Sequence, residues 1–237
     1  MERHFDEQLE SLKNQLMKMS AMAEVMIADA VRSVVERDAS AISPVYEREE
    51  LVNQMQVEID ETCLTLIALN QPAAADLRFL LGAVKTNAEL ERLADEAVNI
   101  VQKAEHLLKG EQVKPFEVIP EMAPIARSMV RDSLRAFVNR NSDLAREVLR
   151  RDDRLDDLRS KIADILTVCM TKTPELIPSA LDLLLISRYL ERIGDHATNI
   201  AENTIFVVEG VDVRHHADQK RAIKRLYAPN AESKKVG

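Results

Sequence analysis

Residues 90–100 read LERLADEAVNI, and residues 190–200 read LERIGDHATNI. Seven of the eleven positions are identical, and the two segments are offset by 100 residues. Agreement of this length is not expected by chance, so the chain contains an internal duplication. Each half is therefore predicted to have the same architecture.

The duplication extends upstream at an offset of 103, where residues 29–32 match 132–135 and residues 49–53 match 152–156. Only 3% of the residues are aromatic and there are 5 Gly, a composition that favours helices over sheets. Apolar residues recur at spacings of three and four, and polar breaks interrupt this pattern. The expected helices span residues 8–37, 40–69, 73–108, 118–140, 143–170 and 175–208.

Long amphipathic helices joined by short turns predict an all-α protein made of two tandem antiparallel three-helix bundles. The first bundle is expected in residues 1–110 and the second in residues 118–211. Residues 212–237 lose the apolar periodicity and are expected to form a partly disordered tail.

The composition also limits the function. A net charge of -8 gives an acidic surface, which lacks the basic field of nucleic-acid-binding proteins, so no nucleic-acid partner is expected. Charged residues occupy the N-terminus, and no stretch approaches the roughly 18 apolar residues of a membrane span. We therefore expect a cytoplasmic protein.

Acidic residues line up across the predicted helix hairpins. Residues equidistant from a tight turn lie level with each other, because each rises about 1.5 Å along its helix. Glu49 and Asp95, for example, are equidistant from the turn at Pro72. The same construction aligns Asp29, Glu49, Asn53, Glu91 and Asp95 in the first half, and Asp132, Asp152, Asp156, Glu191 and Asp195 in the second.

Two carboxylates four residues apart share one face of a helix, where they repel each other unless a cation lies between them. Oxygen ligands without nitrogen favour a hard cation such as Mg, Mn or Fe over structural Zn. A second interpretation is that Arg78, Arg92, Arg188 and Arg192 form ordinary ion pairs with these acids. The duplicated, level-matched pattern favours metal binding.

Catalytic equipment is not evident in the sequence, which has no Gly-rich phosphate loop, nucleophile elbow or Cys/His dyad. We therefore predict a protein that is not an enzyme; the alternative is a carboxylate-bridged metalloenzyme of the helical-bundle type. His196 follows Asp195 and has no counterpart at Glu96, so it is expected to be a surface residue rather than a ligand.

The doubled motif at residues 91–100 and 191–200, together with Gln71-Pro72 and the segment 76–78, resembles the PhoU family of phosphate transport accessory proteins. The likeness covers about residues 3–214. It implies tandem three-helix bundles, dimers or higher oligomers, and multinuclear metal clusters. The ligands it implies are Glu91, Asp95, Glu191 and Asp195, facing Glu49, Asn53, Asp152 and Asp156. Because Asn53 is a neutral amide, the first cluster is expected to bind more loosely.

The resemblance also implies a role. A member of this family would be a negative regulator of phosphate uptake and of the phosphate-starvation response. It would link the ATPase subunit of a phosphate ABC transporter to a sensor histidine kinase, and would lie at the inner face of the membrane through these partners.

Overall fold

The computed structural model describes residues 2–110, 118–211 and 213, and every regular element within them is helical. The first helix begins six residues earlier than expected, and the other bounds agree with the predicted ones within three residues. The long helices are α1 Glu2–Val35, α2 Ser43–Asn70, α3 Ala74–Lys109, α4 Val118–Val138, α5 Ser142–Lys172 and α6 Ile177–Glu209, with 3-10 turns at Ala39–Ala41 and Pro174–Leu176. The predicted all-α class is confirmed.

Polar N-caps begin helices, and a left-handed backbone position ends one, at places where the apolar pattern of the sequence breaks. Asp38 Oδ1 accepts a hydrogen bond from Ser40 N at 3.0 Å, and Asn141 Oδ1 accepts one from Leu144 N at 3.0 Å. At the end of α2, Gln71 adopts a left-handed conformation with φ 45°, which turns the chain toward α3. The short connections fold each half into antiparallel hairpins.

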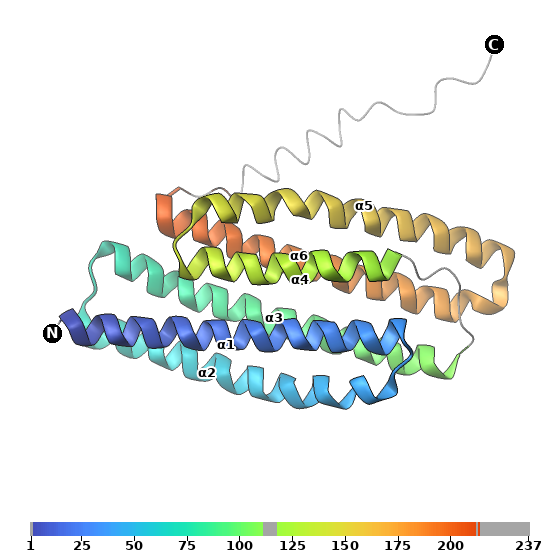
Figure 1. Cartoon of the computed structure of the whole chain (residues 1–237), viewed down its shortest axis with the longest axis horizontal. Coiled ribbons are helices and arrows are strands. Elements are labelled where there is room, and N and C mark those ends of the chain that lie inside the picture. The colour runs from blue at the N-terminus through green and yellow to red at the C-terminus, as the bar shows by residue number, and fades with distance from the viewer. Residues whose placement is uncertain (1, 111–117, 212, 214–237) are drawn as a thin grey trace, which may run out of the picture.

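The two halves lie side by side and share one core. In Figure 1, α4–α6 lie alongside α1–α3, with α1 next to α4. α3 packs along α6, and α1 packs along α4, so buried apolar side chains run continuously from one half to the other. Phe79 of α3 stacks on Phe137 of α4 with ring centroids 5.0 Å apart. Hairpin arithmetic within each half does not predict this packing between the halves.

Two glycines allow α6 to pack closely on its neighbours. A Cβ atom at Gly82 would lie 2.6 Å from Val207 Cγ2, so the absence of a side chain lets α3 approach α6. A Cβ atom at Gly194 would lie 2.6 Å from Leu155 Cδ1, which brings the repeated motif of α6 against α5. The acidic pair of α6 is thereby held close to the acids of α5.

The predicted tail, residues 212–237, lies outside the described residues except for Val213. Within the described part of the chain, none of the helices combines the length and the apolar character that crossing a bilayer requires.

Candidate functional site

The first acidic cluster lies between α2 and α3. Glu91 and Asp95 are one turn apart on α3, and Glu49 of α2 is close enough to act on both. Burial raises the pKa of Glu91 above its ordinary value, and Asp95 and Glu49 raise it further. Burial and Glu49 likewise raise the pKa of Asp95. The hairpin therefore brings the carboxylate of Glu49 near the motif pair, where it disfavours the charged forms of Glu91 and Asp95.

Asn53 lies in the same cluster and is held by one of its acids. Its side-chain nitrogen donates a hydrogen bond to Glu49 Oε1 at 2.5 Å. This hydrogen bond orients Glu49. The side-chain oxygen of Asn53 is an uncharged group of the kind that coordinates hard cations. The first cluster thus contains one amide at the position that an aspartate occupies in the second cluster.

The second cluster lies between α5 and α6. Burial raises the pKa of Glu191, and Asp195 and Asp156 raise it further while Arg159 opposes them. Burial and Asp156 raise the pKa of Asp195 as well. Arg159 Nε lies 3.8 Å from Glu191 Oε2, so this cluster has a cation at its edge.

Asp152 is buried against the same helix. It is 1% exposed, and its Oδ1 would lie 3.5 Å from a Cβ atom at Gly194, one residue before Asp195. The structure therefore places both α5 aspartates, Asp152 and Asp156, against the motif helix α6.

The two aspartates of the first helices are engaged with arginines. Asp29 accepts from Arg48 Nη1 at 2.8 Å and lies 3.2 Å from Arg32 Nη1. Asp132 accepts from Arg151 Nη1 at 2.5 Å, and Arg151 is the repeat equivalent of Arg48. Each aspartate therefore ties the first helix of its half to the second, and its charge is already compensated.

His196 does not lie on the surface as expected; it is 8% exposed, so that prediction was wrong. The position after the motif aspartate faces the other half, because α6 packs on α3. His196 Nδ1 lies 2.7 Å from Glu89 Oε2, and Asn199 Nδ2 donates to the same oxygen at 3.1 Å. Burial acts to raise the pKa of Glu89, but these hydrogen bonds outweigh it and hold that pKa below its ordinary value.

Two motif arginines also form ion pairs outside the acidic clusters. Arg92 Nη1 lies 3.1 Å from Glu89 Oε1, and Arg192 Nη2 crosses to Glu96 Oε1 at 3.1 Å. Each motif helix thus points its paired acids toward its own half and the following residues toward the other half. Glu96 and His196 occupy equivalent positions in the repeat, and His196 Nε2 lies 4.0 Å from Glu96 Oε1. An acid in one motif and a histidine at the same position in the other is the sequence signal for this contact between the halves.

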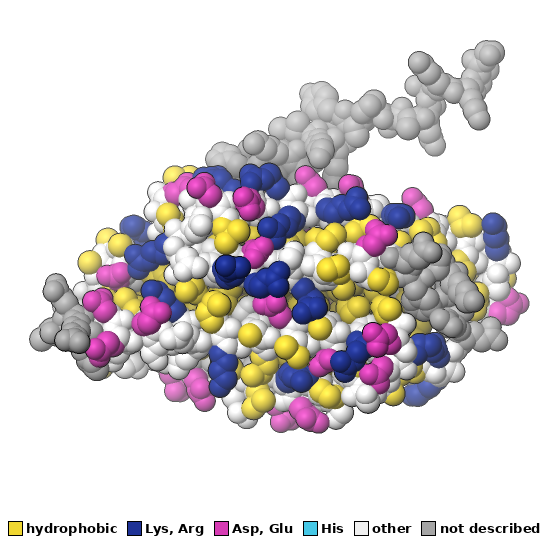
Figure 2. Space-filling view, viewed as in Figure 1, with side chains coloured by type: hydrophobic (Ala, Val, Ile, Leu, Met, Phe, Trp, Pro, Cys, Tyr) yellow, Lys and Arg dark blue, Asp and Glu magenta, His cyan; other side chains and the backbone are white. Residues whose placement is uncertain are grey.

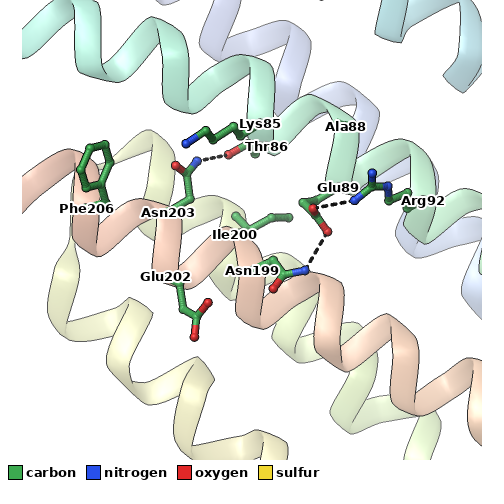
Figure 3. Close-up of a pocket in the computed structure, with 10 residues that line it drawn as sticks. All are labelled: Lys85, Thr86, Ala88, Glu89, Arg92, Asn199, Ile200, Glu202, Asn203 and Phe206. Carbon is green, nitrogen blue, oxygen red and sulfur yellow. Dashed lines mark hydrogen bonds and ion pairs between the residues drawn. The ribbon is translucent and has the colours of Figure 1, made fainter. Parts of the chain in front are cut away.

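A pocket of about 400 Å³ lies between α3 and α6 beside this network (Figure 3). Asn203 Nδ2 donates to Gly82 O at 2.8 Å and to Thr86 Oγ1 at 3.1 Å, and Lys85 Nζ lies 5.7 Å from the centre of the Phe206 ring. Sequence reasoning missed the pocket because the packing of the two halves forms it. Its size suits a small molecule. However, the carboxylate of Glu89 on the pocket wall is already in contact with His196 and Asn199.

The acidic clusters contain the oxygen ligands that a hard cation prefers, but their side chains are not arranged to bind one. Within residues 2–110, 118–211 and 213, no group of three or more His, Cys, Asp or Glu is placed so that it could hold a metal ion as it stands. Neighbouring carboxylates nevertheless raise the pKa of the four motif acids, and a cation between the acids would relieve this repulsion. Binding would require the side chains to rotate toward one another.

Comparison with known proteins identifies relatives over most of the chain. The PhoU domain family model matches residues 16–104 and 119–204. The PhoU homolog of Pseudomonas putida is 37% identical over 215 residues, which are 90% of this chain and 84% of that protein. The PhoU protein of Escherichia coli K12 is 35% identical over 89% of this chain and 88% of its own length. Both are named phosphate-specific transport system accessory proteins.

Two solved structures share the fold. The crystal structure of PhoU from Pseudomonas aeruginosa superposes with a TM-score of 0.84 at 34% identity, covering 87% of this chain and all of that one. The phosphate transport system regulatory protein PhoU from Streptococcus pneumoniae gives a TM-score of 0.81 at 26% identity, over 88% of this chain and 99% of its own. The duplicated sequence, the helices of the described residues and these two solved structures indicate the same helical fold with two repeats.

Proposed function

Because the chain belongs to the PhoU family, we propose that it is an accessory regulator of phosphate transport that binds cations at two acidic clusters and acts through protein partners. In this proposal it is a negative regulator of phosphate uptake and of the phosphate-starvation response. It links the ATPase subunit of a phosphate ABC transporter to a sensor histidine kinase on the cytoplasmic side of the membrane, as a homodimer or a higher oligomer.

The observation that carries the cation part is that the same acidic cluster occurs in both halves. Glu91 and Asp95 meet Glu49, and Glu191 and Asp195 meet Asp156, with the pKa of all four motif acids raised. Holding carboxylates close together is unfavourable without a counterion, and each half repeats the arrangement.

The chain's own residues would hold Mg, Mn or Fe through carboxylate oxygens, and the bound cation would supply positive charge that fixes the helix hairpin. The second cluster is proposed to bind more tightly, since Asp156 is charged where Asn53 is neutral. Asp152 lies behind the second cluster, where it would add to its negative potential.

The adaptor part is supported by the family and by the form of the molecule. The relatives are named as accessory or regulatory proteins of phosphate transport. The long helical faces of α1 and α4 offer surface for partner proteins.

Co-purification tests the adaptor role. The tagged chain, extracted from cells grown with abundant phosphate, is expected to bring down the transporter ATPase and the sensor kinase. The control is the same tagged chain from phosphate-starved cells, where we expect less of one or both partners. Recovery of neither partner under either condition would refute the adaptor role.

A further inference from the structure

A row of arginines lies on the outer face of α4. Arg127, Arg131 and Arg135 are spaced by four residues, so their side chains share one face of the helix. The side chains of Arg131 and Arg135 are 52% and 56% exposed. Figure 2 shows Lys and Arg side chains gathered in the middle of this face, where α1 and α4 lie side by side.

Acids on this face compensate the row only loosely. Arg131 Nη1 lies 3.9 Å from Glu24 Oε2 of α1, and Arg131 Nε lies 3.9 Å from Asp132 Oδ1. Arg135 Nη1 lies 4.0 Å from the same Asp132 oxygen. Asp132 is already bound to Arg151 at 2.5 Å. Among the described residues, no hydrogen-bond acceptor meets the buried Nε atom of Arg127. The exposed guanidinium groups therefore retain donors and charge for another molecule.

The three-helix unit itself does not require the first two arginines of the row. The repeat offset of 103 places Glu24 at the position of Arg127 and Ala28 at the position of Arg131. By contrast, the ion pairs of Asp132 with Arg151 and of Asp29 with Arg48 are equivalent in the two halves. A feature needed for the bundle recurs in both repeats, and Arg127 and Arg131 do not.

The neighbouring helix α1 also carries exposed apolar side chains. Val25 is 43% exposed, and Met17, about two turns earlier on α1, is 38% exposed. Met17 and Val25 are eight residues apart, as are Arg127 and Arg135, and eight residues correspond to about 12 Å of helix. Arginine and methionine beside apolar groups are typical of the centres of protein interfaces.

We propose that this α1–α4 face docks an acidic amphipathic helix of a partner protein. Carboxylates one turn apart on that helix would meet the arginine row, and its apolar side chains would cover Met17 and Val25. The match of charge selects an acidic partner from others of the same shape and speeds its association. This inference rests on the proposed function, because it assigns a surface to the adaptor role.

The test measures binding of the full-length chain to the purified transporter ATPase and to the cytoplasmic part of the sensor kinase. Arg127→Glu/Arg131→Glu is expected to weaken binding of one partner at least about tenfold, since like charges would then face each other. Arg131→Gln, a milder change at an exposed position, is expected to weaken it about threefold. Wild-type affinity should also fall as salt is raised, and fall less in the variants.

The matched control is Lys161→Glu/Lys172→Glu, which reverses two exposed charges on α5 away from this face. It is expected to bind both partners as the wild type does, and circular dichroism checks that every variant folds. Unchanged binding by Arg131→Gln and the double variant would overturn the inference while leaving the adaptor role intact. A wild-type chain that binds neither partner would remove both.

A second copy of the chain is the competing occupant of this face. Sedimentation of the wild type and of the double variant separates the two cases. An oligomer that dissociates in Arg127→Glu/Arg131→Glu, without loss of partner binding by the subunits, would overturn the inference. An unchanged oligomeric state with weakened partner binding would support it.

Discussion

An ion pair between Arg192 of α6 and Glu96 of α3 links the two halves at the edge of their shared core. Arg192 Nη2 lies 3.1 Å from Glu96 Oε1, and the Glu96 carboxylate is 3% exposed. Replacing Arg192 with Leu would leave that carboxylate buried without its main cation. We expect the free energy of unfolding to fall by about 1–3 kcal/mol.

The magnitude follows from the surroundings of the pair. Removing one member of a fully buried pair costs about 3–5 kcal/mol. Arg192 is 46% exposed, so water already screens part of the interaction. Asn99 Nδ2 still donates to Glu96 Oε2 at 3.2 Å after the substitution, which keeps one charge-assisted hydrogen bond. The expected cost therefore lies below the fully buried range.

Urea unfolding followed by circular dichroism measures this cost in a double-mutant cycle with Glu96→Gln. In the Glu96→Gln background, Arg192→Leu should cost at least about 1 kcal/mol less than in the wild type, because no buried charge is left behind. Equal costs in the two backgrounds would refute the reasoning, and so would a cost below about 0.5 kcal/mol in the wild type.

Three further variants test the clusters and the shared core. Because burial and Asp156 raise the pKa of Asp195, its charged form is penalised in the folded protein; metal-free Asp195→Asn should therefore be more stable than wild type at pH 7, and the gain should vanish as the pH falls below the ordinary carboxyl pKa of about 4. A pH-independent difference in urea unfolding would contradict this. Phe137→Ala, which removes a fully buried ring stacked on Phe79, should lower the unfolding free energy by about 3–5 kcal/mol; a loss under about 1 kcal/mol would show that the halves do not share a tight core. Gly82→Val should cost about 1–3 kcal/mol through overpacking between α3 and α6, and a stabilised variant in thermal melts would argue against close packing.

Much of the fold could be predicted because the signals were local. The self-match of residues 90–100 with 190–200 predicted the duplication, and Pro72 and Asn141 marked turns between helices. Equidistance from the turns at Pro72 and Pro174 predicted that Glu49 lies level with Asp95 and that Asp156 lies level with Glu191, since an antiparallel hairpin fixes the level of every residue. These contacts follow from one half alone.

The contacts between the halves could not be predicted in this way. They depend on which faces of α3 and α6 meet, and no turn fixes that register. His196 was misplaced for this reason, and its partner Glu89 was not anticipated. Asp29 shows a different limit: hairpin geometry predicts its height on α1, but the competing arginines Arg48 and Arg32 decide its partner.

In the proposed function, the two acidic clusters bind cations. The most direct measurement is metal content after loading with Mn²⁺ and dialysis, for the wild type beside Glu91→Ala/Asp95→Ala and Glu191→Ala/Asp195→Ala. We expect about one or more ions per wild-type chain, a partial loss in the first variant and a larger loss in the second. Fewer than about a tenth of an ion per wild-type chain, or equal content in all three proteins, would contradict the claim.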